Sequence, residues 1–116
     1  MPKVLFILND PPYGSERGYN GLRLAGALAK REAEVKVFLM GDAVSWAKRG
    51  QTAPQDSYNT ELMLGQVTHH GGAVGVCGTC MDARGIAVEE LAEGTQRGTL
   101  EQLADSTVWA DQVLVF

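Results

Sequence analysis

The sequence predicts an α/β fold, a three-layer sandwich around a mostly parallel five-stranded sheet with flavodoxin-like winding. Two observations support this prediction. Short apolar runs alternate with segments in which apolar residues recur at helical spacing, and the first run, Val4–Leu8, is apolar at every position. A strand that is hydrophobic on both faces is typical of the centre of a parallel sheet. We expect strands at residues 4–8, 35–40, 73–76, 94–98 and 112–116.

Between these strands, the spacing of apolar residues predicts helices at 17–31, 43–48, 58–68, 88–93 and 99–110. Ser15 and Asp42 are expected to cap the first two helices. Thr99 and Gln102 form the capping-box pattern of the last one. Residues 50–57 are polar and rich in turn formers, so they are expected to form the longest exposed loop. Strands joined by such helices form right-handed βαβ units.

Composition limits the function classes. The 116 residues suffice for one domain, residues 1–116, with a single core. A net charge of −4 without a Lys/Arg cluster argues against a nucleic-acid partner. No apolar stretch approaches the ~20 residues of a membrane span, and the start lacks the layout of a signal peptide, so we expect a cytoplasmic protein. Thiols stay reduced there, and a Cys-x-x-Cys pair then points to catalysis, redox chemistry or metal binding.

The two cysteines, Cys77 and Cys80, follow the third predicted strand in the segment Val74–Gly85. If a helical turn begins at Gly78 or Thr79, Cys77 lies at its N-terminus, where negative charge and therefore a thiolate are favoured. We expect Cys77 to be the nucleophile. A nearby cation would stabilise its thiolate and an anionic sulfur species, and Arg84 is the candidate for this role. Asp82 is expected only to cap a helix.

Three loops follow predicted strands: Asn9–Glu16, Gly41–Asp42 and Cys77–Arg84. In a parallel sheet the carboxyl ends of the strands lie at one edge, where ligand sites form, so the three loops are expected to share a rim. The candidate catalytic residues are Cys77, Cys80 and Arg84. The candidate substrate-binding residues are Asn9, Asp10, Tyr13, Gly14, Glu16, Arg17, Gly41, Asp42, Gly78 and Thr79.

The residues alone leave several interpretations of the cysteines open. They could be inert buried thiols, a persulfide carrier with a resolving or protecting partner, or a dithiol–disulfide pair. A zinc site would need His69 and His70 as further ligands, but their spacing from the cysteines is shorter than in zinc fingers. Those histidines close a predicted helix and are expected to complement its dipole from the surface. We expect no metal and no other cofactor.

Several motifs resemble the DsrE/DsrF family of sulfur-relay proteins, which includes TusD-like subunits. They are the Pro12-Tyr-Gly14 loop after the first strand, the Leu-x-x-Ala-Leu helix that follows, the strand-three cysteine eight residues before Gly85, and the terminal Val-Leu-Val-Phe. The resemblance covers essentially the whole chain. It implies a five-stranded parallel α/β sandwich and a persulfide on Cys77. It also implies a homo-oligomer (dimer, trimer or hexamer) and transfer of sulfur to small carriers of the TusA type.

The second cysteine departs from this family pattern. TusD-like relay subunits generally have a small residue where Cys80 stands, so the chain resembles the stand-alone branch of the family. A dithiol–disulfide function therefore remains an alternative to sulfur carriage. A non-catalytic oligomeric binding subunit is the other alternative, because Trp46 and Trp109 lie on predicted helices and are expected in the core or at a subunit contact.

Overall fold

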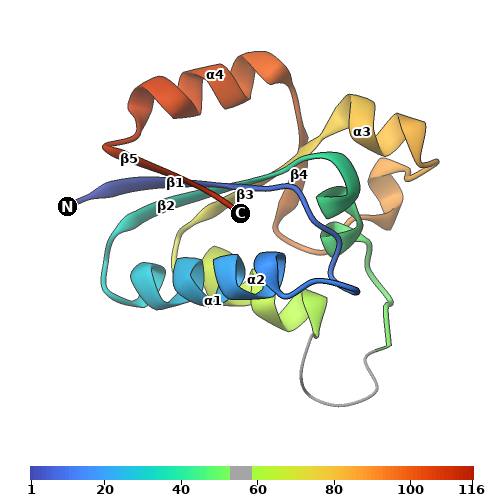
Figure 1. The fold of residues 1–116 in the computed structure, drawn as a ribbon, viewed down its shortest axis with the longest axis horizontal. Coiled ribbons are helices and arrows are strands. Elements are labelled where there is room, and N and C mark those ends of the chain that lie inside the picture. Colours follow the sequence, from blue (N-terminus) through green and yellow to red (C-terminus); the bar gives the residue numbers. More distant parts are fainter. Residues whose placement is uncertain (53–58) are drawn as a thin grey trace.

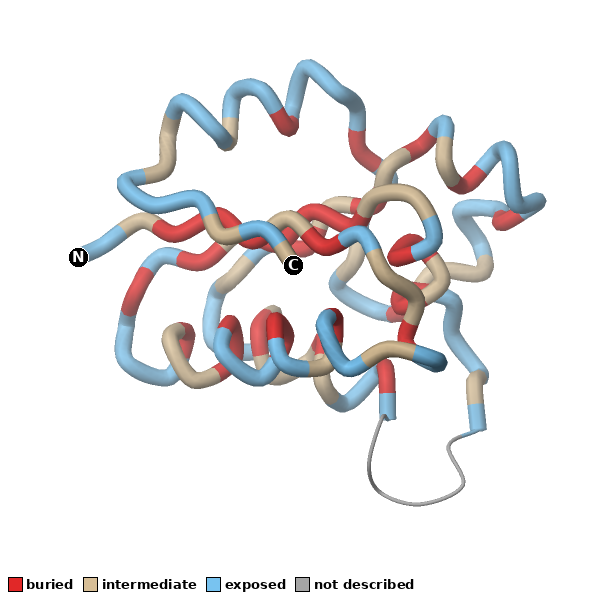
Figure 2. Tube along the Cα trace, in the orientation of Figure 1, coloured by how far each residue is buried: buried red, intermediate tan, exposed pale blue. Residues whose placement is uncertain are grey.

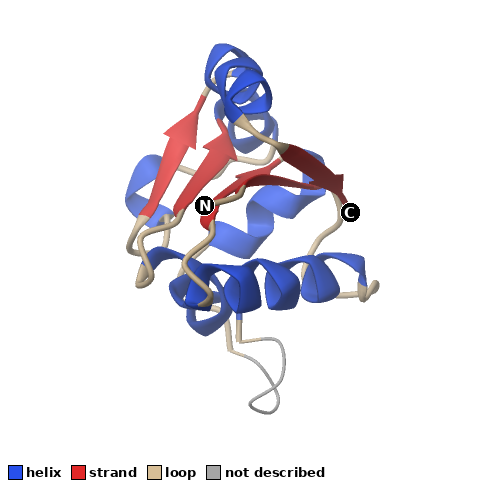
Figure 3. Cartoon of the chain, turned by 90° about the vertical axis from the view of Figure 1, so that its left-hand side faces the viewer, coloured by secondary structure: helices blue, strands red, loops and turns tan. Residues whose placement is uncertain are grey.

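The computed structural model describes residues 1–52 and 59–116 and contains a five-stranded sheet in which all neighbouring strands run parallel. Each predicted strand is present, within a residue or two of the expected ends. Helices cover both faces of the sheet, which confirms the three-layer α/β sandwich (Figures 1 and 3). The strands are β1 (Lys3–Leu8), β2 (Glu34–Leu39), β3 (Ala73–Cys77), β4 (Thr95–Gly98) and β5 (Gln112–Val115).

The order of the strands is β4-β3-β2-β1-β5. The chain steps from β1 through β2 and β3 to β4 in one direction, and only β5 returns to the other side of β1. This differs from the 2-1-3-4-5 order of flavodoxin-like winding, in which the second strand lies outside the first. The polar strand β4 is one edge of the sheet. The apolar strand β5 is the opposite edge and is largely exposed.

Helices α1 (Arg17–Lys30) and α2 (Thr60–Thr68) lie on one face of the sheet, and α4 (Leu100–Trp109) lies on the other (Figure 1). The short helix α3 (Gly78–Ala83) directly follows β3 beyond the carboxyl end of the sheet. No helix in the described residues is long and apolar enough to cross a membrane.

Two predicted α-helices are 3₁₀ segments instead, η1 (Gly41–Ala47) and η2 (Val88–Glu90). The segments that follow them pair with each other: the Arg49 amide donates to the Glu90 carbonyl and the Ala92 amide to the Ala47 carbonyl, at 2.8 and 2.7 Å. Backbone groups bonded across segments are not free to extend a helical ladder. Each 3₁₀ segment ends at a residue whose carbonyl accepts one of these bonds, η1 at Ala47 and η2 at Glu90.

The predicted caps are partly wrong. Glu16 occupies the N-cap position of α1, and Ser15, one residue earlier, accepts from the Arg17 amide. Asp42 lies inside η1, and its carboxylate pairs with Arg84 instead of capping. The capping box at the start of α4 is present as predicted.

Helix α2 begins at Thr60, with the Asn59 side chain accepting from the Leu62 amide. The prediction placed its start at Tyr58, which lies outside the described residues. Most of the predicted loop at 50–57 also lies outside them.

The core is divided unequally between the two faces of the sheet. The larger part lies between the sheet and α1, α2 and η1, and Trp46 is completely buried in it (Figure 2). Trp46 also donates to the Asp10 carbonyl, so its predicted core role is correct. On the face covered by α4, the described residues supply a smaller buried cluster of Leu5, Phe38 and Leu103.

Candidate functional site

Cys77 ends β3, and Cys80 lies in the first turn of α3; both thiols are partly exposed. The predicted helical turn after Cys77 is present and begins at Gly78. Residues three apart on a helix lie on the same side, so this turn brings Cys80 back towards the sulfur that the strand delivers. The two thiols influence each other's pKa.

The surroundings separate the acidities of the two thiols. Burial raises the pKa of Cys77, but hydrogen bonds from the side chains and backbone of Cys80 and Thr79 outweigh it, so the pKa is lowered overall. The Thr79 hydroxyl lies 3.4 Å from the Cys77 sulfur. A lowered pKa increases the fraction of thiolate, which is the nucleophilic form. The surroundings therefore favour the thiolate form at Cys77.

Cys80 has the opposite shift. Burial and its hydrogen bond with Cys77 raise the pKa of Cys80, and the bond from Gly41 together with the charge of Arg84 offsets this only in part. The Gly41 amide donates to the Cys80 sulfur at 3.2 Å from a backbone with φ of +55°, a conformation that favours glycine. The arrangement therefore disfavours the thiolate form of Cys80.

Arg84 belongs to this cluster, next to Cys80. Its Nε and Nη2 donate to Asp42 at 3.0 and 2.8 Å, and its Nη1 donates to the Cys80 carbonyl at 3.0 Å. Arg84 was predicted to stabilise the Cys77 thiolate. These contacts instead direct its guanidinium to Asp42 of η1 and to the Cys80 carbonyl. Arg84 ties the end of α3 to η1.

Two residues near Cys77 were not predicted as part of the site, Arg97 and Asp82. Arg97 donates from Nη1 and Nη2 to the two carboxylate oxygens of Asp82 at 2.8 and 2.9 Å, so Asp82 is an ion-pair partner and not merely a cap. The hydrogen bond to Asp82 raises the pKa of Arg97, and attraction to Cys77 adds to this. The same bond lowers the pKa of Asp82.

The sequence held one signal for Arg97. It lies in the predicted strand 94–98, next to the last residue, but placing it beside the cysteines requires knowing that β4 pairs with β3. In the structure Cys77 is the register partner of Gly98 and Val76 that of Arg97. Pairing between strands is a non-local property that hydrophobic periodicity does not reveal.

The loop after β1 forms a separate cluster. The Asn9 amide and side chain donate to the Phe116 carbonyl, and Asp10 accepts from Ser15 and pairs with Arg17 at 3.8 Å. The remaining loop candidates are Tyr13, which is exposed, Gly14, with φ of +93°, and Glu16. In the part of the chain that the structure describes, no hydrogen bond or ion pair joins these six residues to either cysteine. Asn9 does lie beside Gly41, since its carbonyl oxygen would be 3.8 Å from a Cβ added there.

The histidines lie away from the thiols. His69 ends α2, and His70 Nδ1 lies 2.9 Å from the Gln66 carbonyl. Strand β3 then runs from Ala73 to Cys77, which places the histidines at the opposite end of that strand. Across residues 1–52 and 59–116, no group of three or more His, Cys, Asp or Glu side chains is arranged to hold a metal ion.

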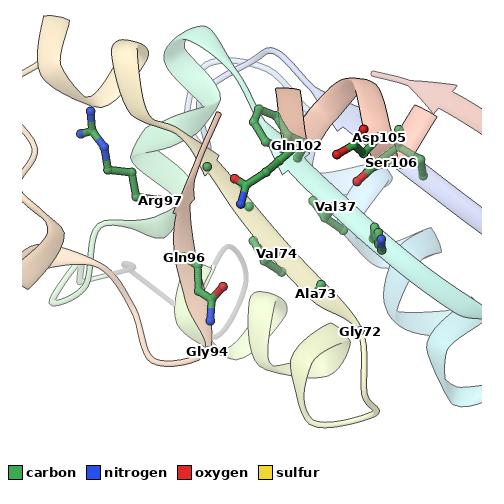
Figure 4. Close-up of a pocket in the computed structure, with 15 residues that line it drawn as sticks. Val37, Gly72, Ala73, Val74, Gly94, Gln96, Arg97, Gln102, Asp105 and Ser106 are labelled. Atoms are coloured by element: carbon green, nitrogen blue, oxygen red, sulfur yellow. The ribbon is translucent and has the colours of Figure 1, made fainter. Parts of the chain in front are cut away.

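A groove of about 470 Å³ runs along β2, β3 and β4 on the face that α4 covers (Figure 4). Small residues, including Gly75 and Gly98, form its floor, and Gln102 and Asp105 of α4 form one wall. Arg97 lies at one end of the groove, and its guanidinium points away from the middle, towards α3. The groove is therefore a neighbour of the thiol cluster and not its enclosure.

Comparisons with known proteins agree with this architecture. The model of the DsrE/DsrF-like family matches residues 2–116. Protein YchN of Escherichia coli K12 is 44% identical over 118 residues that cover 100% of both chains. The uncharacterized protein MK0008 of Methanopyrus kandleri is 34% identical over 113 residues, covering 97% of this chain and 93% of that one.

Comparison with solved structures supports the same fold. The crystal structure of the E. coli ychN protein superposes with a TM-score of 0.93, at 44% identity and over 100% of both chains. The protein of unknown function MTH1491 from Methanobacterium thermoautotrophicum has a TM-score of 0.74 at 15% identity, covering 98% of this chain and 99% of that one, and so supports the fold alone. Since the family model and these relatives span essentially the whole chain, the protein belongs to the DsrE/DsrF-like family.

Proposed function

We propose that the protein carries sulfur as a persulfide on Cys77. The observation that supports this most directly is that the pKa values of the two thiols are shifted in opposite directions. The pKa of Cys77 is lowered by hydrogen bonds from Cys80 and Thr79, whereas that of Cys80 is raised. Cys77 is partly exposed at the end of a strand, where a small donor can reach it. Membership of a family associated with sulfur relay supports the same chemistry.

In the first step, the Cys77 thiolate attacks the sulfane sulfur of a donor. The new S–S bond forms as the bond between the sulfane sulfur and the rest of the donor breaks, and the leaving group takes the electron pair. In the second step, the thiolate of an acceptor attacks the terminal sulfur of the persulfide, and Cys77 leaves as a thiolate. Thiosulfate and polysulfide are suitable donors for a test, and a small TusA-type carrier in the cytoplasm would be the physiological acceptor.

Intact-protein mass spectrometry after exposure to thiosulfate or polysulfide tests the proposal. We expect the wild type and Cys80→Ser to gain one sulfur atom and Cys77→Ser to gain none. The added sulfur should leave when a thiol reductant is supplied, which distinguishes a persulfide from irreversible oxidation. Loading of Cys77→Ser to the wild-type level would contradict the proposal.

A dithiol–disulfide function is the second candidate, because Cys77 is the N-cap of the helix whose first turn contains Cys80 and the two thiols influence each other's pKa. In this reaction the Cys80 thiolate attacks the Cys77 sulfur of the persulfide, forming the Cys77–Cys80 disulfide and releasing hydrosulfide. An external thiol must then reduce the disulfide to restore the pair. The same spectra decide between the two functions: a loss of two hydrogens without retained sulfur, abolished by either cysteine substitution, would favour this reaction.

We also propose that the protein assembles with copies of itself. Large apolar side chains are exposed on α4 and on the edge strand β5, among them Leu100, Val108 and Val115. Sedimentation velocity gives the oligomeric state directly, and a monomer at micromolar concentration would contradict this part of the proposal. If blocking both thiols leaves assembly intact and no variant loads sulfur, a non-catalytic binding subunit is the better interpretation.

A further inference from the structure

We propose that Arg97 binds the oxyanion of the sulfur donor, so that the site prefers sulfane donors that carry a sulfonate, with thiosulfate as the simplest. The inference rests on the proposed sulfur carriage by Cys77 and adds a substrate class to it. It assigns the recognition of charge to Arg97 of β4 rather than to Arg84.

The position of Arg97 is fixed against the residue that follows Cys77. A Cβ added to Gly78 would lie 2.7 Å from Arg97 Nε, 2.8 Å from Cζ and 2.9 Å from Nη2, so the guanidinium occupies the space that any larger side chain would need. Gly78 therefore allows Arg97 to approach the backbone beside the nucleophile. The positive charge stands one residue from the thiolate that attacks the donor.

The guanidinium is also oriented and still accessible. Its hydrogen bonds in the described part of the chain go to Asp82, through one N–H on each terminal nitrogen. A guanidinium has five N–H donors in a rigid plane, so three remain to meet an oxyanion. The Arg97 side chain is 40% exposed, which leaves those donors open to a ligand.

Arg84 is less suited to this task. Three of its N–H groups are already engaged, two by Asp42 and one by the Cys80 carbonyl. Its charge acts on Cys80 rather than on Cys77. Of the two arginines in the cluster, Arg97 is the one placed beside the nucleophile.

The chemistry explains why such a cation matters. The Cys77 thiolate and thiosulfate are both anions, and their approach is opposed unless a positive group accepts part of the charge. The thiolate attacks the outer sulfur, the S–S bond of thiosulfate breaks, and sulfite leaves with the electron pair, so that a thiolate and a dianion yield a persulfide anion and a dianion. A guanidinium held near the sulfonate would bind both the donor and the departing sulfite.

The first experiment measures charge preference at Cys77 without requiring sulfur transfer. In a Cys80→Ser background, the thiolate reacts with methanethiosulfonates that carry a sulfonate, a trimethylammonium or no charge; each forms a mixed disulfide and releases methanesulfinate. We expect Arg97→Gln to slow the sulfonate reagent relative to the trimethylammonium reagent by roughly tenfold, the effect of losing a charge-assisted contact. Arg31→Gln is the matched control, because Arg31 bonds to the Ala27 carbonyl of its own helix.

The uncharged reagent distinguishes recognition of the sulfonate by Arg97 from a general change in the nucleophilicity of Cys77. If Arg97 acted only through the acidity of Cys77, all three reagents would slow equally, and the proposal would be overturned. Gly78→Ala is a second variant that keeps the charge but pushes the guanidinium away. It is expected to reduce the preference for the sulfonate in the same direction as Arg97→Gln.

The second experiment applies the proposal to the donor. Arg97→Gln should raise the thiosulfate concentration needed for half-maximal loading of Cys77 by roughly tenfold, while loading by polysulfide, which has no sulfonate, stays near the wild-type level. An unchanged thiosulfate dependence would refute the role of Arg97 and leave sulfur carriage standing. Failure of the wild type to load from either donor would refute sulfur carriage itself.

Discussion

Burial and the interaction with Cys77 raise the pKa of Cys80, whereas hydrogen bonds from Cys80 and Thr79 outweigh burial and lower the pKa of Cys77, three residues earlier. The Cys80 thiol donates to Cys77, which stabilises the Cys77 thiolate, and the same bond disfavours ionisation of Cys80. The Gly41 amide lowers the pKa of Cys80 without overcoming these effects. These effects favour the thiolate at Cys77 over the thiolate at Cys80. The acidity of the nucleophile is therefore a property of both residues.

Removal of the Cys80 donor should make Cys77 less acidic. We expect Cys80→Ala to raise the pKa of Cys77, and Cys80→Ser, which retains a hydroxyl donor, to raise it less. The rate of alkylation of Cys77 by iodoacetamide, measured against pH by mass spectrometry, gives the pKa in each variant. Because a lowered pKa keeps the thiolate populated at lower pH, the midpoint of the profile should move upward in Cys80→Ala. Coincident profiles for the wild type and Cys80→Ala would contradict this hydrogen-bond explanation.

At this scale the sequence predicts the part of the site that strand ends deliver. Cys77, Gly41 and Asp42 each follow a strand, and the common edge of a parallel sheet brings them together. Arg97 escaped prediction because it lies within β4 and reaches the cluster through its long side chain. The loop after β1 shows the converse: it lies at the same edge, yet its polar groups bond to the C-terminus and to each other.

The element that presents the thiols, α3, is a six-residue helix. A helix of this length is not stable alone, so contacts with its neighbours must hold it. Two ion pairs do so from opposite sides: Asp42 of η1 with Arg84 at the end of the helix, and Asp82 of the helix with Arg97 of β4. The position of Cys80 relative to Cys77 depends on this double attachment.

Loss of one attachment should loosen α3 with little effect on the whole fold. We expect Arg84→Gln to lower the free energy of unfolding by no more than about 1 kcal/mol, because solvent screens an ion pair whose partners are 35% and 66% exposed. Amide hydrogen exchange in α3 should nevertheless accelerate, since the bond to the Cys80 carbonyl is lost as well. Arg31→Gln provides the comparison on an unrelated helix. Unchanged exchange across residues 78–83 would show that Arg84 does not hold the helix.

Helix α4 depends on its first turn in a different way. Thr99 Oγ1 accepts from the Gln102 amide at 3.1 Å, and Gln102 Oε1 accepts from the Thr99 amide at 2.9 Å. We expect Thr99→Ala to cost about 1 kcal/mol and Thr99→Ser to cost little, because serine retains the accepting oxygen. Urea unfolding measures both. Equal losses in the two variants would point to the threonine methyl group instead of the cap.

Element types were predictable where local signals sufficed, as at this capping box. They were not predictable where pairing between distant segments decided the outcome. Residues 43–48 and 88–93 carry helix-compatible sequences, but both form 3₁₀ segments whose last carbonyls, of Ala47 and Glu90, accept hydrogen bonds from the distant amides of Ala92 and Arg49. The capping prediction for Asp42 was wrong for the same reason, because a partner 42 residues away engages its carboxylate.

For the molecule as a whole, the hydrophobic periodicity of the sequence predicted the three layers of the fold. It did not predict that the two faces of the sheet bury unequal numbers of side chains. The face covered by α1 and α2 contains most of the buried side chains, while the face under α4 has a small cluster and the open groove. Small residues line this second face: a Cβ added to Gly75 or Gly98 would come within 3.0 Å of the Phe38 ring. The strand sequences do not indicate which face receives which helix.

The unequal packing of the two faces predicts that core substitutions on them will destabilise the protein to different extents. Leu64 of α2 is 1% exposed and packs in the larger core, so Leu64→Ala is expected to lower the free energy of unfolding by about 2–5 kcal/mol. Leu103 of α4 is 7% exposed and contacts a cluster with few members, so Leu103→Ala should cost an amount at or below the lower end of that range.

Native-state hydrogen exchange provides the decisive comparison. Amides of α4 should open at a lower free energy than those of α1 and α2, and Leu103→Ala should widen the gap while leaving the other face protected. If α4 exchanges only through global unfolding, the two faces form one cooperative unit. If it opens first, the groove over β3 and β4 can change shape while β3 still holds Cys77 in place, because the larger core anchors that strand through Val74 and Val76.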